Sequence, residues 1–408
     1  MAADKQDKVL NVPTLRFPEF KGEWNDYRLR DLCTFHSGGT PSIDNVEYWE
    51  GEIPFVSAVA MHNTHIEKTP LTLTEKGLRN GSKQLEAGNL LLLVRGSMLW
   101  NKIPICYNDV DVAFNQDVKG IVPNSKTTSL FLLNWIQSHE NRIKYMVTGT
   151  GIGAGKLDSE DLLALNVKLP SLNEQKKIEK FLSLIDERIE TQIRIINKLQ
   201  SLMKGLNDYL QDSVPLSYSL SFSDIGEDYS GLSGKSAEDF RSGKPYITYV
   251  SIYANNFVED DCCGKVSVER GEKQNVVQKG DMLFTLSSET PEEVCYGAVY
   301  SGNSTETYLN SFCFGVRNTE EKVFSPYMAY FFNSSRFRRE VYPLAQGSTR
   351  FNLQKSDFLQ KQFSYPSIEN QHRIFEILNA YDNKIKVENK ILAHYQLQKD
   401  FLLRNLFI

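Results

Sequence analysis

Two long stretches of the chain carry apolar residues at steps of three and four, the spacing of one face of an α-helix. In the first stretch, Ser171 follows a proline and precedes Glu174 by three residues, which is typical of a capping box at a helix start. From Asn173 to about Leu210 the pattern predicts a helix of roughly 38 residues, on the order of 55 Å long at about 1.5 Å per residue. Its apolar positions are Ile178, Leu182, Ile185, Ile189, Ile196, Leu199, Met203, Leu206 and Leu210.

The second stretch lies near the end of the chain and has the same spacing. A helix of this length is longer than a domain of about 150 residues is wide, so each helix needs a further packing partner. We favour mutual packing as an antiparallel coiled coil, which would relate the two halves by an approximate two-fold axis. The alternative is that each helix packs only on its own globular part. The apolar positions here are Ile374, Leu378, Tyr381, Ile385, Leu392, Tyr395 and Leu402.

The two remaining regions, about 15–165 and 215–362, show a different pattern. Short apolar or alternating runs such as Leu90–Val94 and Asp281–Leu286 are separated by Gly, Asn and Pro. This pattern predicts β-rich domains with few helices. One helix is expected in each, near 130–146 and near 326–341, because both segments are rich in aromatic and apolar residues and end in basic ones.

The chain repeats itself. Pro170-Ser-Leu-Asn-Glu-Gln175 recurs 196 positions later as Pro366-Ser-Ile-Glu-Asn-Gln371, and the apolar helix positions recur with it. A period of this length is too long for a solenoid and indicates duplication of a domain pair. The sequence therefore predicts an α+β protein with two tandem β-rich domains, each followed by a long helix, and the two helices pairing antiparallel. The predicted divisions are 1–168, 169–213, 214–364 and 365–408.

Composition and charge exclude several classes of protein. Lys and Arg number 46 against 51 Asp and Glu, a formal net charge of −5, so this is not a polybasic protein. Hydrophobic residues make up 41% of the chain, which is enough to form buried hydrophobic cores. The start, 1–10, is polar, and no stretch approaches the roughly 18 apolar residues that a membrane span needs. We therefore expect a cytoplasmic protein with free thiols.

Motifs for metal, nucleotide or catalytic chemistry are missing. The six cysteines contain no Cys-x-x-Cys pair, and His62 and His65 lack a third metal ligand. The glycine-rich segment 149–156 is not a phosphate loop, because Thr150 replaces a required glycine and Leu157 replaces the Ser or Thr that binds magnesium. No hydrolase triad, zinc-protease motif or repeated carboxylate pair is recognisable. The pattern favours a binding protein, with no metal and no cofactor in this chain.

Local charge is the clearer functional signal. In both copies a basic helix end precedes a loop rich in Gly, Ser and Thr, which can offer guanidinium and backbone N–H donors to phosphates. The alternative is a solvated surface patch, but recurrence in both copies favours function. The candidate phosphate contacts are Arg142, Lys144, Lys156, Arg336, Arg338, Arg339, Arg350 and Lys355. Weaker hydroxyl candidates are Ser37, Thr40, Thr148 and Thr150, and the turn with Ser97 and Asn101 is either a groove-entering loop or a plain strand end.

The order of domain, long helix, divergent domain and similar long helix resembles the specificity subunit of type I restriction–modification systems. Several motifs agree with this family as a set. They are Val12-Pro-Thr-Leu-Arg-Phe-Pro-Glu-Phe-Lys-Gly-Glu-Trp24, Ser37-Gly-Gly-Thr-Pro41, Tyr48-Trp49, Ile53-Pro-Phe55 and the Pro170–Gln175 segment before the first helix. The second domain lacks the Ser-Gly-Gly-Thr-Pro and Tyr-Trp motifs and has Ser223–Gly234 instead, which resembles another subgroup.

The resemblance implies two target-recognition domains, each reading one half of a bipartite, asymmetric site in double-stranded DNA. It implies that the helices act as a spacer and as a docking surface for two methyltransferase subunits. In that family the specificity subunit is not catalytic. Methyl transfer from S-adenosylmethionine belongs to the modification subunits, and ATP-driven translocation and cleavage, with magnesium, to the restriction subunits.

Two other hypotheses remain at this point. One is a coiled-coil scaffold whose domains bind protein or ligand without nucleic acid. The other, a free-standing nuclease or methyltransferase, is disfavoured because the chain has no Asn/Asp-Pro-Pro-aromatic motif for a flipped base. Acidic residues outnumber basic ones in both globular domains, so DNA contact requires a concentrated face on each. We expect weak DNA binding by this chain without its partners.

Overall fold

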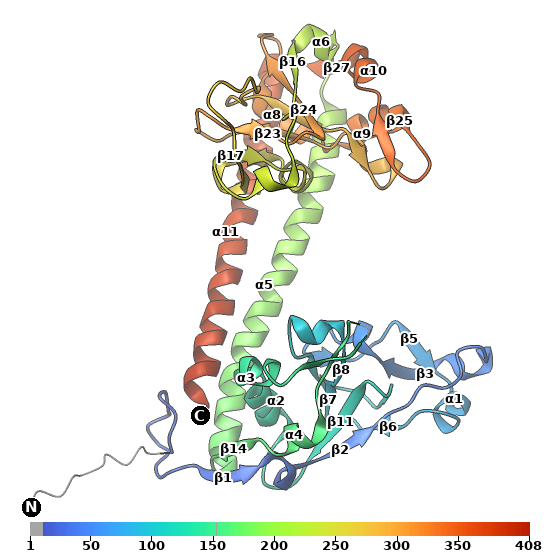
Figure 1. Cartoon of the computed structure of the whole chain (residues 1–408), viewed down its shortest axis with the longest axis vertical. Helices are drawn as coiled ribbons and strands as arrows, with labels where there is room; N and C mark the ends of the chain where they lie inside the picture. Colours follow the sequence, from blue (N-terminus) through green and yellow to red (C-terminus); the bar gives the residue numbers. More distant parts are fainter. Residues whose placement is uncertain (1–10, 152) are drawn as a thin grey trace, which may run out of the picture. The chain divides into compact units, whose positions relative to one another are not determined.

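The computed structural model describes residues 11–151 and 153–408, so the polar start and position 152 of the glycine-rich segment lie outside the described residues. The chain forms two compact units. The first contains the residues up to Gln192 together with Ile391–Ile408, and the second contains Ile193–Lys390. The long helices α5 (Leu172–Ser213) and α11 (Ile368–Leu406) each contribute one part to each unit (Figure 1).

The start of α5 is anchored by polar contacts. The backbone N–H of Glu174 lies 3.4 Å from the Ser171 hydroxyl, as the capping pattern predicts. Within the described part of the chain, the Glu174 carboxylate makes no return hydrogen bond to Ser171, so the capping box is incomplete. Instead it accepts hydrogen bonds from Arg16 Nε (2.7 Å) and Trp24 Nε1 (3.3 Å), which fasten the segment before the first domain to the helix.

Within each unit the two long helices meet through opposite parts of their sequences. In the first unit, Ile178 and Leu182 of α5 share a core with Leu406 of α11. Lys399 pairs with Asp186 at 2.6 Å. In the second unit, the start of α11 shares a core with Met203, Leu206 and Leu210 of α5. The pairing is therefore antiparallel in both units, as the sequence pattern predicts, and each helix also packs on a globular domain.

Both units contain a five-stranded sheet of the same topology. In the first unit the order β2-β11-β7-β9-β4 is antiparallel except for the β4–β9 pair, and the second unit repeats it as β16-β24-β20-β22-β18. The central strands β7 and β20 are buried along their whole length. The strands are β2 (Cys33–Ser37), β11 (Val118–Pro123), β7 (Leu90–Leu93), β9 (Ile105–Asn108), β4 (His65–Ile66), β16 (Gly226–Ser230), β24 (Cys313–Asn318), β20 (Met282–Thr285), β22 (Gly297–Tyr300) and β18 (Phe257–Val258).

Smaller sheets complete each unit. Each unit has a second sheet, with the order β5-β3-β10-β6 in the first unit and β19-β17-β23 in the second. In both, one pair of strands is parallel, namely β3 with β10 and β17 with β23. A two-stranded sheet, β1-β14 or β15-β27, pairs the strand that begins each domain with the strand before the long helix that follows it. The strands are β5 (Leu71–Leu73), β3 (Trp49–Val56), β10 (Val112–Phe114), β6 (Gln84–Leu85), β19 (Cys263–Val266), β17 (Lys244–Ile247), β23 (Tyr308–Leu309), β1 (Asn25–Arg28), β14 (Asn166–Leu169), β15 (Leu216–Leu220) and β27 (Phe363–Pro366).

The prediction of a single helix in each domain is wrong. Each predicted helix is a pair of short helices in the structure. In the first unit α2 (Ser129–Ser138) and α3 (Glu140–Lys144) are separated at His139, whose ring stacks on Trp135 and lies 2.9 Å from its carbonyl oxygen. In the second, Ser334 separates α8 (Ser325–Phe331) from α9 (Ser335–Val341) by capping the latter. Polar side chains that bond to nearby backbone interrupt helices in this way.

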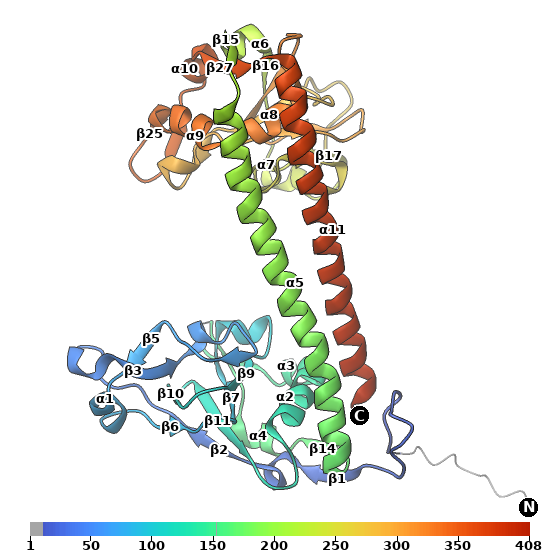
Figure 2. The same cartoon turned by 180° about the vertical axis from the view of Figure 1, so that it is seen from behind.

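These helix pairs connect the sheets to the long helices. In the first unit α2 lies between the strands and α5 (Figures 1 and 2). In the second unit, Asn207 of α5 donates to the carbonyl oxygen of Tyr330 at 2.9 Å. The other α-helices are α1 (Glu75–Arg79), α4 (Ser159–Leu163), α6 (Phe222–Ile225), α7 (Tyr249–Ala254) and α10 (Lys355–Gln360). No helix among the described residues is long and apolar enough to cross a membrane.

Candidate nucleic-acid interface

The glycine-rich segment of the first unit is the turn of a β-hairpin. Strands β12 (Thr148–Gly149) and β13 (Gly155–Lys156) form the hairpin, and β13 also pairs with β8 (Arg95–Gly96). Thr148 is opposite Lys156, and Lys156 is opposite Arg95. Residues directly opposite in a sheet project from the same face. One hydroxyl and two cationic side chains therefore form a row across this small sheet, which we call the first row.

The second unit has the corresponding sheet, in the order β21-β26-β25, with different chemistry. Gln346 on β25 (Ala345–Gln346) is opposite Asn352 on β26 (Phe351–Leu353), and Asn352 is opposite Ser287 on β21 (Ser287–Ser288). This second row consists of two amides and a hydroxyl and carries no charge. At the hairpin turn Gly347 has φ +135°, and a Cβ there would lie 2.1 Å from the carbonyl oxygen of Arg350, so this turn requires glycine.

Aromatic side chains that the sequence analysis missed flank the first row. Trp100 donates from Nε1 to the carbonyl oxygen of Gly153 at 3.0 Å, which holds the hairpin turn, while its side chain stays about half exposed. Tyr145, between α3 and the hairpin, is 92% exposed. Lys144 donates to the carbonyl oxygen of Asn101 at 2.8 Å and so ties α3 to the turn that carries Trp100. No local motif marks these aromatic residues as a group.

The Ser37–Thr40 loop is connected to the same region through one turn. Thr40 donates to the Gln116 side chain at 2.7 Å, and Lys119 donates to the Ser37 hydroxyl at 2.5 Å. The carbonyl oxygen of Asp117 accepts the backbone N–H of Arg95 at 3.3 Å. The loops and strands that carry the hydroxyl candidates are therefore connected to the first row by hydrogen bonds or by strand pairing. These candidates are Ser37, Thr40, Thr148 and Thr150.

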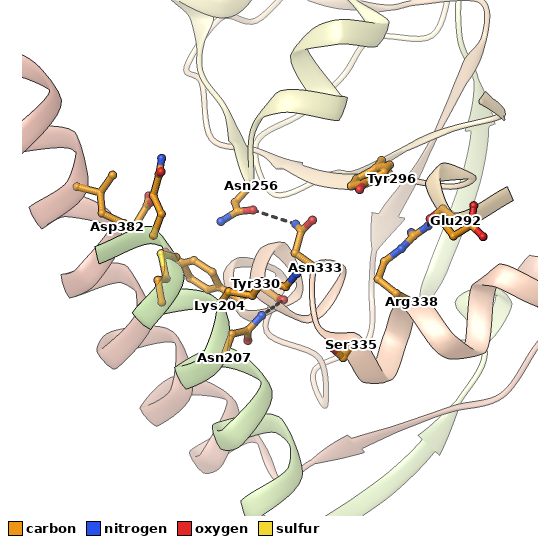
Figure 3. Close-up of a pocket in the computed structure, with 13 residues that line it drawn as sticks. Lys204, Asn207, Asn256, Glu292, Tyr296, Tyr330, Asn333, Ser335, Arg338 and Asp382 are labelled. Atoms are coloured by element: carbon orange, nitrogen blue, oxygen red, sulfur yellow. Dashed lines mark hydrogen bonds between the residues drawn. The ribbon is translucent and has the colours of Figure 1, made fainter. Parts of the chain in front are cut away.

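Two of the predicted phosphate contacts in the second unit are directed at backbone carbonyls. Arg336 donates to the carbonyl oxygen of Ser364, and its side chain is only 14% exposed. Arg338 donates to three carbonyl oxygens of the segment 292–295 at 2.6–2.9 Å. Its guanidinium stacks over the ring of Tyr296, 4.8 Å from the centroid (Figure 3). Burial lowers the pKa of Arg338.

The other basic candidates differ in how far they are engaged. Lys355 pairs with Asp228 at 2.6 Å, and Lys156 with Asp158 at 3.8 Å. Arg339 is exposed, and among the described residues its side chain donates only to the carbonyl oxygen of Ser335 in its own helix. Arg350 is exposed and lines a cavity of about 240 Å³ beside Phe312, which is itself 61% exposed. Arg142 is exposed on α3, and no ion pair joins it to another described residue.

Comparison with protein families identifies related sequences. A family model described as the type I restriction modification DNA specificity domain matches the chain twice, over residues 21–201 and 223–394. The type I restriction enzyme EcoR124I/EcoR124II specificity subunit of Escherichia coli is 29% identical over 184 residues, which are 45% of each chain, so that match spans under half of the relative. The MjaVIII specificity subunit of Methanocaldococcus jannaschii is 25% identical over 415 residues, covering 95% of this chain and 92% of the relative.

Solved structures share the fold. A type I restriction–modification S subunit from M. genitalium matches with a TM-score of 0.53 at 15% identity, over 97% of this chain and 99% of that one. A chain from a structural study of the assembly and conformational transition of a type I system matches with a TM-score of 0.57, also at 15% identity, over 94% and 97%. At this identity the likeness concerns the fold, and it confirms the α+β tandem architecture predicted from the sequence.

Proposed function

The chain belongs to the family of type I restriction modification DNA specificity domains, and on this premise we propose how it reads DNA. As a DNA sequence-specificity subunit, it presents two recognition domains. Each unit reads one half of a bipartite, asymmetric site in double-stranded DNA. The scaffold alternative has less support, because the family model matches both halves of the chain.

The observation that carries this proposal is the chemical contrast between the two rows. A two-stranded β-ribbon fits the major groove of B-DNA, where Arg and Lys favour guanine and Asn and Gln favour adenine. The first row offers Lys156 and Arg95, whereas the second offers Gln346 and Asn352. Two hairpins at equivalent places in the topology, with different donors and acceptors, suit two different half-sites.

Phosphate contacts flank these rows. The favoured phosphate contacts are side chains that make at most one hydrogen bond within their own unit. They are Arg142 and Lys144 in the first unit and Arg339 and Arg350 in the second. Arg336 and Arg338 instead hold the second domain together. Because the chain has a net charge of −5, much of the phosphate neutralisation falls to partners, and the chain alone binds DNA weakly.

The partners and cofactors follow from the same proposal. Two methyltransferase subunits dock on α5 and α11, which expose several large apolar side chains along their length. These side chains include Leu184, Leu202, Tyr209, Leu397 and Phe401. The modification subunits supply S-adenosylmethionine, and restriction subunits supply ATP-driven translocation with magnesium. This chain holds none of these cofactors, is not catalytic itself, and works in the cytoplasm.

The test is reconstitution with the methyltransferase subunits, followed by mapping of methylated adenines on genomic DNA. The wild-type complex is expected to methylate one bipartite motif. Exchanging 148–156 for the hairpin of a related subunit should change one half of that motif only, and exchanging 345–353 should change the other half only. Absence of any bipartite motif in the wild-type complex would overturn the proposal, and so would a change of both halves after one exchange.

A further inference from the structure

An acidic groove lies in the first unit, against the first half of α5 and the edge strand β4. Its volume is about 340 Å³. Six carboxylates line it, and the only basic side chain in its lining is His65. The carboxylates are Glu67, Asp109, Glu179, Asp186, Glu187 and Glu190. The groove therefore carries a large excess of negative charge.

Internal partners neutralise only part of this charge. Asp109 lies 3.1 Å from the ring of His65, and Asp186 pairs with Lys399. No ion pair joins Glu67, Glu187 or Glu190 to another described residue. Glu179 accepts the hydroxyl of Thr128, and burial raises the pKa of Glu179. At least three acceptors on the rim are left for an external donor.

The floor of the groove contains a buried polar group with an unused oxygen. Asn134 is 5% exposed and lines the groove. Its Nδ2 donates to the carbonyl oxygen of Leu130 at 2.8 Å, whereas its Oδ1 has no hydrogen-bond partner in the part of the chain that the structure describes. A buried acceptor without a donor is rare in a complete structure. Leu130 and Leu133 beside it give the floor an apolar part.

The second unit differs at the matching positions of the repeat. Tyr330 replaces Asn134, and its ring packs against Phe257 of the edge strand (Figure 3 shows Tyr330). Lys386 replaces Glu190 and pairs at 3.0 Å with Glu259, which follows edge strand β18 as Glu67 follows β4. In the second unit the cation belongs to the chain itself. In the first unit Lys399 pairs with Asp186, but no described cation of the chain pairs with Glu67 or Glu190.

The chemistry of the groove selects the kind of ligand. DNA is excluded by the charge. A single metal ion does not fit, because no three His, Cys, Asp or Glu side chains among the described residues are placed to hold one. Spread carboxylates over an apolar floor suit long side chains that end in several N–H donors, namely Lys and Arg.

We propose that the acidic groove binds a Lys- or Arg-bearing segment of the methyltransferase subunit that docks on the first unit. This inference rests on the proposed function, because it assumes that partner. The second unit has Lys386 and an aromatic cluster in this place. Its cavity beside Tyr330 and Asp382, of about 570 Å³, is lined by Lys204 and Arg338 as well as by acidic residues, so it is not an acidic groove. The two methyltransferase copies are therefore held by chemically different contacts.

The experiment uses the full chain reconstituted with its methyltransferase subunits, and native mass spectrometry over a range of salt. Glu187→Lys/Glu190→Lys reverses two exposed rim charges. It should weaken one of the two binding steps at least tenfold, giving a complex with one methyltransferase copy. The milder Glu187→Gln/Glu190→Gln should have a smaller effect in the same step. The control Glu52→Lys/Glu86→Lys makes the same charge change at exposed positions of the first domain, outside α5 and α11, and should keep both copies.

Three results would count against the proposal in distinguishable ways. If the wild-type chain binds no methyltransferase subunit, the proposed function fails and the groove assignment with it. If Glu187→Lys/Glu190→Lys binds two copies with the wild-type salt dependence, only the groove assignment fails. If spermidine raises the thermal midpoint of the wild type but not of this variant, while both bind two copies, the groove holds a free polycation instead.

Discussion

The side-chain oxygen of Gln371 accepts the backbone N–H of Phe324 at 2.8 Å. Its amide nitrogen donates to the carbonyl oxygens of Lys322 and Pro366 at 2.8 and 2.9 Å. Gln175 makes the matching bonds in the first unit, and both side chains are fully buried. In both copies, one glutamine fastens the first turn of a long helix to the strand before it and to the loop that leads into the short helix pair.

We predict that Gln371→Ala destabilises the second unit by about 2–4 kcal/mol, because it leaves one buried N–H and two carbonyl oxygens without their partner. Urea unfolding followed by hydrogen exchange of peptides from 193–390 measures this effect. Gln360→Ala is the control, since Gln360 is exposed on α10 and its loss should change stability by no more than about 0.5 kcal/mol. Equal effects of the two substitutions would contradict the prediction.

The role of this glutamine shows how far the sequence can be interpreted. The repeat draws attention to Gln175 and Gln371, and the apolar periodicity predicts the helices that they begin, because both are properties of nearby residues. Two of the bonding partners of each glutamine lie 47 and 49 positions earlier in the chain, so these bonds depend on tertiary packing. For the same reason the breaks at His139 and Ser334 were missed, since a polar side chain that interrupts a helix also occurs within intact helices.

The candidate site was predictable to a similar extent. Charge runs predicted basic helix ends in both copies, and these exist. The sequence does not give the direction of each side chain, so it could not separate Arg338, which bonds to backbone, from exposed Arg339. The acidic groove combines residues from 64 to 190, with no local pattern that joins them.

The neighbouring arginines of α9 should give opposite results. Arg338→Ala removes the donor of three carbonyl bonds and should destabilise the second unit by about 2–4 kcal/mol. Arg339→Ala should leave unfolding unchanged but weaken DNA binding by the reconstituted complex on all sequences and reduce the slope of log affinity against log salt by about one. Fluorescence anisotropy at several salt concentrations measures the second effect. A stable Arg338→Ala protein with the reduced salt slope would show that these roles are reversed.

The end of the chain is part of the core of the first unit. Phe407 is 6% exposed, and its ring lies 5.2 Å from that of Phe131 on α2. Phe407→Ala should cost about 3–5 kcal/mol through lost burial and the cavity left behind. All four tryptophans lie in the first unit, so intrinsic tryptophan fluorescence during urea unfolding reports on it specifically. Phe401→Ala changes a side chain that is 59% exposed near the end of α11, and this variant should unfold as the wild type does. If both variants unfold alike, Phe407 does not contribute to this core.

Acid should weaken the second unit through Glu272. The Lys235 ammonium at 2.6 Å, with Gln274 and the backbone N–H of Glu269, lowers the pKa of Glu272 to about 2 from an ordinary 4.5. A carboxyl group whose pKa is lower in the folded state stabilises the fold above about pH 4.5, and this contribution is lost as the pH falls towards 2. Glu272→Gln should therefore be less stable than the wild type at pH 7, and the difference should shrink between pH 4.5 and 2. This prediction is tested by urea midpoints of the second unit, measured by hydrogen exchange between pH 7 and pH 2. Glu269→Gln, at an exposed position, is the control. If wild type and Glu272→Gln have parallel pH profiles, the Lys235–Glu272 pair contributes nothing to stability.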